Sequence, residues 1–108
     1  MTEELPQPIA AYIAASNAHD ADACATWFTD HAVVRDEGRE MQGTAAIRDW
    51  MDAAIKKYGH VVQVVTFTEA DGKTLVTGRV SGNFPGSPVD LRYTVTLAGE
   101  KIARLEIV

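Results

Sequence analysis

The ten residues VDLRYTVTLA, at positions 89–98, alternate between apolar and polar side chains almost without fault. One phase of this alternation holds Val89, Leu91, Tyr93, Val95 and Leu97. Successive side chains of a strand point to opposite faces, so a period of two predicts a strand with one buried and one solvated face. Sheets with one solvated face are commonly antiparallel, and we expect such a sheet here.

The neighbouring sequence extends this sheet in both directions. The tripeptide Ala-Gly-Glu at 98–100 turns the chain into a last strand at 101–108. Upstream, the β-branched and aromatic residues of 61–68 predict another strand, and Asp71-Gly72 marks a hairpin turn into a strand at 74–84. The second half of the chain therefore predicts an antiparallel meander.

The first half has a helical period instead. Residues 9–16 place apolar side chains on one helical stripe, and Asp20 is a suitable N-cap for a second helix. We expect Trp27 and Phe28 on the apolar face of that helix. A short strand is then expected at 32–36.

The clearest helix covers residues 44–58. A polar loop at 37–43 precedes it, Thr44 is expected to cap it, and Gly59 is expected to end it in a left-handed conformation. Helices followed by strands predict a single α+β domain over residues 1–108, with the helices on one face of a curved sheet.

Composition excludes several classes of function. The net charge is −5 and no basic run is present, so we expect no nucleic-acid partner. The longest apolar stretches are far shorter than the roughly 20 residues of a membrane-spanning helix, so we expect no membrane partner. The N-terminus lacks a signal-peptide pattern, and the single Cys24 cannot form an internal disulfide. We therefore expect a cytoplasmic protein with reduced cysteine.

Two stretches, WFTDHAVVRD at 27–36 and GTAAIRDW at 43–50, combine an aromatic residue, an acidic pair, a strand ending in Asp, a loop and a Gly-x-x-x-Ile helix. This pattern resembles the SnoaL-like and ketosteroid-isomerase-like proteins of the nuclear transport factor 2-like superfamily. That superfamily includes isomerases, dehydratases, epoxide hydrolases, polyketide cyclases and members that only bind or associate, so the resemblance is more specific for fold than for function.

The resemblance implies a cystatin-like, cone-shaped barrel in which a curved antiparallel sheet wraps around the N-terminal helices. An apolar cavity should open at one end and take a small apolar or aromatic ligand, without a cofactor. Cys24 is expected on the inner side, most simply as a small core residue. The residues expected to contact the ligand are Trp27, Phe28, Val34, Trp50, Met51, Tyr58, Gln63, Val76, Val80, Leu91 and Val95.

The outer face of the sheet is expected to be polar but rich in β-branched residues. This composition suits sheet-to-sheet association, which the family commonly shows, and favours a homodimer. The residues expected on this face are Thr66, Thr68, Arg79, Ser81, Arg92, Thr94 and Thr96.

The resemblance also implies a catalytic set. Asp36 matches the general base of a ketosteroid isomerase, which takes a proton from the carbon beside a carbonyl group. Tyr12 matches the helix tyrosine that donates a hydrogen bond to the enolate oxygen. Tyr93 falls at or next to the position of a late-strand acid, which is a departure from the family pattern. These residues predict a cofactor-free isomerase or cyclase acting on a small apolar carbonyl compound.

Alternatives stay open for each residue. Asp36 is equally compatible with a strand end held between Arg35 and Arg39, in a non-catalytic ligand-binding or dimeric association domain. Tyr12 is compatible with a core aromatic residue. His60 has the potential to reach the cavity rim as a second acid or base, but a surface position is favoured.

Two further kinds of site are not supported by the sequence. No His or carboxylate pair has the spacing of a metal site, so we expect no metal. Epoxide hydrolases of the superfamily use an Asp–Arg–Asp set, and the nearest residues here are Asp90 and Arg92. The strand alternation predicts that both lie on the outer face, away from the cavity.

Overall fold

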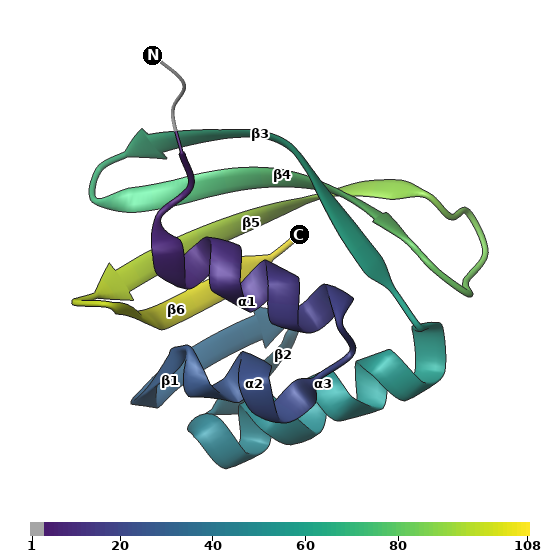
Figure 1. Ribbon diagram of the computed structural model, residues 1–108, viewed down its shortest axis with the longest axis horizontal. Helices are drawn as coiled ribbons and strands as arrows, with labels where there is room; N and C mark the ends of the chain where they lie inside the picture. Colours follow the sequence, from purple (N-terminus) through teal and green to yellow (C-terminus); the bar gives the residue numbers. More distant parts are fainter. Residues whose placement is uncertain (1–3) are drawn as a thin grey trace.

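The computed structural model describes residues 4–108, which form three helices and one six-stranded sheet (Figure 1). This confirms the α+β class. The elements follow in the order α1 (Gln7–Asn17), α2 (Ala21–Thr26), β1 (Phe28–Asp36), β2 (Arg39–Gln42), α3 (Thr44–Tyr58), β3 (Val61–Ala70), β4 (Lys73–Ser81), β5 (Val89–Ala98) and β6 (Lys101–Ile107).

The strand order in the sheet is β2-β1-β6-β5-β4-β3. Strands β3 to β6 form the expected antiparallel meander, whereas β1 is parallel to β6. The expected curved sheet around the helices is therefore confirmed, with one parallel strand pair in it, and the sheet is open because β2 and β3 are free edges. Helix α1 contacts β3 and β6 while α3 contacts β1 and β2, so the helices occupy the concave side between those edges (Figure 1).

The core lies between the concave face and the helices. The core forms because the apolar stripes of the helices, which repeat with helical spacing, pack against the apolar side chains that alternate along the strands and point inward. The side chains that are almost wholly buried include Ile9, Cys24, Phe28, Val34, Ile47, Ile102 and Leu105.

Helix boundaries depend on local capping. The Asp20 side chain accepts a hydrogen bond from the Ala23 amide at 3.0 Å, which confirms it as the N-cap of α2. Gly59 ends α3 with a φ of 53°, as expected. Thr44 is not the cap of α3: Gly43 takes that position with a φ of 87°, a conformation that glycine adopts without strain.

The region between α2 and α3 differs most from expectation. Strand β1 begins at Phe28, so Trp27 ends α2 and Phe28 does not lie on a helix. The expected polar loop contains strand β2, which pairs antiparallel with β1. Glu37 and Gly38 both have positive φ values, 53° and 75°, as a tight hairpin turn requires. Of the side chains of β2, only Met41 is buried, so its edge position left no apolar pattern to read.

The convex face of the sheet is largely polar. Thr66, Thr68, Arg79, Ser81 and Arg92 are exposed there, and Thr94 and Thr96 are half-buried. Arg79 and Asp90 form an ion pair of 3.0 Å between β4 and β5. Within the described part of the chain, no helix combines the length and apolar character needed to cross a bilayer.

Candidate functional site

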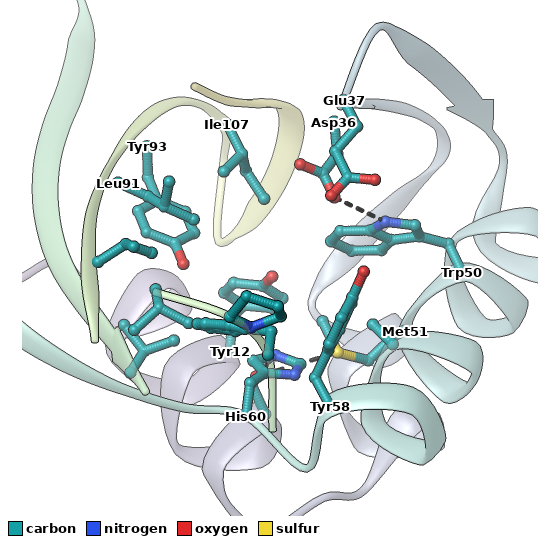
Figure 2. A pocket seen from close by; sticks show the side chains of 17 residues that line it. Tyr12, Asp36, Glu37, Trp50, Met51, Tyr58, His60, Leu91, Tyr93 and Ile107 are labelled. Atoms are coloured by element: carbon teal, nitrogen blue, oxygen red, sulfur yellow. Dashed lines mark hydrogen bonds between the residues drawn. The ribbon is translucent and has the colours of Figure 1, made fainter. Parts of the chain in front are cut away.

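A cavity of about 310 Å³ lies between the concave face of the sheet, α1, α3 and the segment that joins β4 to β5 (Figure 2). This volume is at the lower end of the range for small-molecule sites. Its lining residues are Tyr12, Ser16, Asp36, Glu37, Trp50, Met51, Ala54, Tyr58, His60, Val62, Val80, Phe84, Pro85, Val89, Leu91, Tyr93 and Ile107.

Many of the residues expected at the cavity line it. The three catalytic candidates are among them, although they come from α1, β1 and β5. The complete set shared by expectation and structure is Tyr12, Asp36, Trp50, Met51, Tyr58, Val80, Leu91 and Tyr93.

Other expected ligand contacts do not line the cavity. Trp27 is partly buried against the core, and Phe28 packs edge-to-face on the Tyr12 ring at 5.4 Å. Four other side chains do point to the concave face of the sheet, but they lie away from the cavity, where the core is closely packed. The core residues that were expected to contact ligand, but that do not line the cavity, are Phe28, Val34, Val76 and Val95.

Gln63 was assigned to the wrong face of β3. Its side chain is exposed, whereas Val62 is buried and lines the cavity. The run Val-Val-Gln-Val-Val at 61–65 is apolar in both phases, so its alternation does not reveal which side faces inward. The register with β4 gives the phase, since Val62 lies opposite the buried Val80 and Gln63 lies opposite the exposed Arg79. The Asn17 side chain holds this edge of β3: it donates to the Val62 carbonyl at 2.9 Å and accepts from the Val62 amide at 2.8 Å.

Asp36 ends β1 and is half-buried at the cavity wall. The Trp50 indole nitrogen donates a hydrogen bond to its Oδ2 at 3.2 Å. Burial raises the pKa of the Asp36 carboxyl above its usual range, the Trp50 hydrogen bond opposes this rise, and the nearby Glu37 adds to it. Among residues 4–108, the ion pairs do not include Asp36, so the alternative of a salt bridge with Arg35 or Arg39 is not what the structure contains.

Tyr12 and Tyr93 bring two phenol groups to the same space. Their side chains are only 5% and 9% exposed, and Figure 2 shows both hydroxyl groups and the Asp36 carboxylate directed into the centre of the cavity. Burial is the main cause that raises the pKa of each phenol, and the negative charge of Asp36 contributes to both. Both groups therefore stay protonated and can donate hydrogen bonds at neutral pH.

His60 was expected at the surface but lines the cavity. Its Nε2 lies 3.3 Å from the hydroxyl of Ser16, a side chain that is 1% exposed. His19 bonds to the His60 carbonyl oxygen at 3.0 Å. Burial, together with the charge of His19, lowers the pKa of the His60 imidazole, which keeps it uncharged at neutral pH. The only signal of His60 in the sequence was its place at the start of the strand; its contact with Ser16 joins residues 44 positions apart and has no local signal.

The segment between β4 and β5 forms a wall that sequence reasoning missed. The Asn83 amide donates to the Tyr58 carbonyl at 2.8 Å, and the Phe84 ring packs edge-to-face on Tyr58 at 5.8 Å. Phe84, Pro85 and Val89 thereby line the cavity. Apolar residues do not recur at regular spacing in this segment, which is rich in glycine and proline, so the sequence does not show which of its side chains point inward.

The arrangement of charged side chains bears on two other kinds of site, a metal site and the Asp–Arg–Asp set of epoxide hydrolases. Over residues 4–108, no three His, Cys, Asp or Glu side chains are grouped closely enough to hold a metal ion. Asp90 and Arg92 are both exposed on the convex face, and Asp90 pairs with Arg79. The cavity does provide the Asp36 carboxylate and the Tyr12 and Tyr93 phenols in a largely apolar setting, with Glu37 and Tyr58 also in its lining.

A scan against protein families matches a SnoaL-like domain over residues 9–105. The chain belongs to the SnoaL-like domain family. A candidate polyketide cyclase of Sinorhizobium meliloti is 43% identical, with a TM-score of 0.92 over 96% of this chain and 95% of that one. No match was found among curated proteins.

Solved structures of lower identity share the fold. A Catenulispora acidiphila protein with a ketosteroid isomerase-like fold, solved with trimethylamine, has a TM-score of 0.86 at 19% identity over 97% of this chain and 86% of that one. The epoxide hydrolase/cyclase-like enzyme SalBIII, which acts in pyran ring formation in salinomycin, has a TM-score of 0.81 at 21% identity over 94% and 86% of the two chains. At these identities the likeness concerns the fold, and the expected cystatin-like architecture is confirmed.

Proposed function

We propose that this SnoaL-like protein is a cofactor-free isomerase or cyclase that enolises a small carbonyl compound. Asp36 is the general base, and Tyr12 and Tyr93 stabilise the enolate oxygen. The observation that carries the proposal is the convergence of one carboxylate and two phenol hydroxyls on a single apolar cavity (Figure 2).

The chemistry needs no group beyond these residues. Asp36 takes a proton from the carbon beside the carbonyl, and the electron pair of the broken C–H bond moves onto the carbonyl oxygen. The oxygen accepts hydrogen bonds from Tyr12 and Tyr93. In an isomerase, Asp36 returns the proton to another carbon of the conjugated enolate. In a cyclase, the enolate carbon attacks a second carbonyl of the same molecule, whose π electron pair moves onto its oxygen, and this oxygen takes the proton that Asp36 holds.

Both the base and the donors are suited to these roles by their surroundings. A carboxyl pKa above its usual range makes Asp36 a stronger base, and general-base catalysis contributes typically about 10²–10⁴-fold. Trp50 holds the carboxylate in place through its indole N–H. Donors fixed in a water-poor site act on charge that develops only in the transition state, and each is worth roughly 10²–10³-fold.

The family relationship supports this proposal over a purely binding role. The Sinorhizobium meliloti relative, at 43% identity, is named as a candidate polyketide cyclase, which supports an enzyme of the cyclase class. A binding domain has no need for a desolvated carboxylate without an ion-pair partner, because such a group costs stability.

The test is exchange of α-protons for deuterium in small cyclic ketones, followed by NMR in D₂O. We expect the wild-type protein to accelerate exchange and Asp36→Asn to remove most of that acceleration. Tyr12→Phe and Tyr93→Phe should each reduce it. Asp30→Asn is the matched control, since it makes the same change to an exposed side chain of the same strand. Exchange that is as fast in Asp36→Asn as in the wild type would contradict the proposal.

A further inference from the structure

The charged groups of the cavity are all of one sign. Its lining includes the carboxylates of Asp36 and Glu37, whereas no Lys or Arg of residues 4–108 lines it. Since the pKa of His60 is lowered, its imidazole adds no positive charge at neutral pH. An anionic ligand would therefore enter an apolar space next to like charge with no cation to pair with it.

The nearest basic groups do not compensate this charge from within the cavity. The Lys57 ammonium lies 5.1 Å from the centre of the Tyr58 ring but is not a lining residue. Arg39 acts on Asp36 only through its longer-range charge, since the two form no ion pair. The Asp36 carboxylate therefore has one hydrogen bond from a side chain, that of Trp50, and no counter-ion.

Several aromatic rings line the walls of the cavity. The rings of Tyr58 and Phe84 meet at 85° with centroids 5.8 Å apart, which forms a corner of two aromatic surfaces. Trp50 lies near the Tyr58 ring, with its indole N–H bonded to Asp36 (Figure 2). Aromatic faces attract organic cations, by about 0.5–1 kcal/mol at exposed sites and 2 or more when the cation is desolvated.

Two hydroxyl groups of the cavity wall identify a second requirement of the ligand. The Tyr12 and Tyr93 side chains are at least nine-tenths buried, and their hydroxyl groups point into the cavity (Figure 2). Among residues 4–108 neither oxygen is a buried atom without a partner, so both are accessible from the cavity and can donate to a carbonyl or hydroxyl oxygen of a ligand.

From these features together, we propose that the cavity selects a small organic cation. Its tertiary or quaternary ammonium group lies against the aromatic corner and the Asp36 and Glu37 carboxylates, and an oxygen of the same molecule accepts from Tyr12 and Tyr93. The inference rests on the proposed ligand pocket and names the charge of its ligand. A substrate of this class is a carbonyl compound with an ammonium group close to the carbonyl.

The test compares three molecules of nearly the same shape but different charge: choline, 3,3-dimethylbutan-1-ol and 3,3-dimethylbutanoate. Binding is measured by NMR titration at pH 7 and low salt. We expect choline to bind at least about tenfold more tightly than the neutral alcohol, a difference of about 1.4 kcal/mol, and the carboxylate to bind weakest. Equal affinity for choline and the alcohol, or no binding of choline up to about 10 mM, overturns the inference.

Variants assign the preference to the named groups. Glu37→Gln and Asp36→Asn should each weaken choline binding and leave the affinity for the alcohol unchanged. Phe84→Leu keeps the wall apolar but removes the ring, so it should reduce choline affinity more than alcohol affinity. Glu100→Gln, in the exposed turn between β5 and β6, is the matched control and should change neither. A choline preference that persists in all three cavity variants also overturns the inference.

The outcome is separable from that of the proposed function, because charge preference is measured without turnover. If neutral ketones exchange their α-protons but choline has no advantage over the alcohol, the cation inference fails and the enolisation proposal stands. If choline is preferred and no exchange of any ketone is detected, the enolisation proposal fails and the cation inference stands.

Discussion

Gly78→Ala places a methyl group beneath one of the two proposed enolate donors. Gly78 lies on β4 opposite Leu91 of β5, and a Cβ built on it lies 2.9 Å from Val62 Cγ1 and 3.0 Å from Tyr93 Cε1. Ordinary contacts between carbon atoms are about 3.5–4.0 Å, so the two neighbours must move by roughly 0.5–1 Å. The Tyr93 hydroxyl is carried with its ring.

The expected cost follows from that displacement. Overpacking of a core typically costs about 1–3 kcal/mol. For a domain of about this size, each kcal/mol lowers Tm by roughly 4–8 °C, so we expect a fall of about 5–20 °C. Misplacement of a catalytic group by 1 Å costs up to about 10²-fold in rate, so ketone exchange should fall by one to two orders of magnitude.

The assays are a thermal melt followed by circular dichroism and the deuterium-exchange assay on the folded protein. Ser81→Ala, at an exposed position of the same strand, is the control and should change neither result. In a Tyr93→Phe background, Gly78→Ala should still lower Tm but should no longer lower the rate as strongly. A Gly78→Ala variant with unchanged Tm and unchanged rate would refute the placement of the Tyr93 ring against this backbone.

Four further predictions concern the base, the edge strand and the outer face. Trp50→Phe removes the indole donor that favours the charged form of Asp36, so its pKa should rise further, and the acid limb of the pH–rate profile should move to higher pH. The pKa of Asp36 is raised in the folded state, so its contribution to stability is present below the unfolded pKa and is lost as pH rises through the folded value. Asp36→Asn should therefore raise the free energy of unfolding at pH 7, as measured by urea denaturation. This gain should disappear in acid. Asn17→Ala removes both hydrogen bonds to the Val62 backbone and should cost about 1–3 kcal/mol in the same assay. We also propose a homodimer through the convex face, on which Leu75 is 38% exposed; Leu75→Arg should halve the mass measured by light scattering, and an unchanged dimer mass would place the contact elsewhere.

Much of the fold was readable from the sequence because its elements have strong local signals. The alternation of 89–98 predicted β5, and the inward positions of Tyr93 and Val95 followed from it. Asp20 and Gly59 marked helix ends through their own backbone and side-chain chemistry. The expected helix at 44–58 matches α3.

Elements without such signals were misjudged. Strand β2 is a four-residue edge strand with a single buried side chain, so it had the composition of a loop. The phase of β3 was ambiguous because apolar residues occupy both faces around Gln63, and only the register with β4 resolves it by placing Gln63 opposite the exposed Arg79. The parallel pairing of β1 with β6 was not expected, because it joins distant parts of the chain and has no local signal.

The sequence by itself determined the class of fold, the family and the three groups proposed for catalysis, since each depends on local period or on a matched motif. Only the tertiary structure decided which inward side chains meet a cavity and which fill the core: Phe28 and Val95 face the same side of the sheet as Tyr93, yet they pack in the interior. It also decided the environment of Asp36 and brought Ser16, His60 and Phe84 to the cavity. Alternation along a strand fixes the face of each side chain but not the depth of packing above it, which depends on how the helices and the β4–β5 segment lie across the sheet.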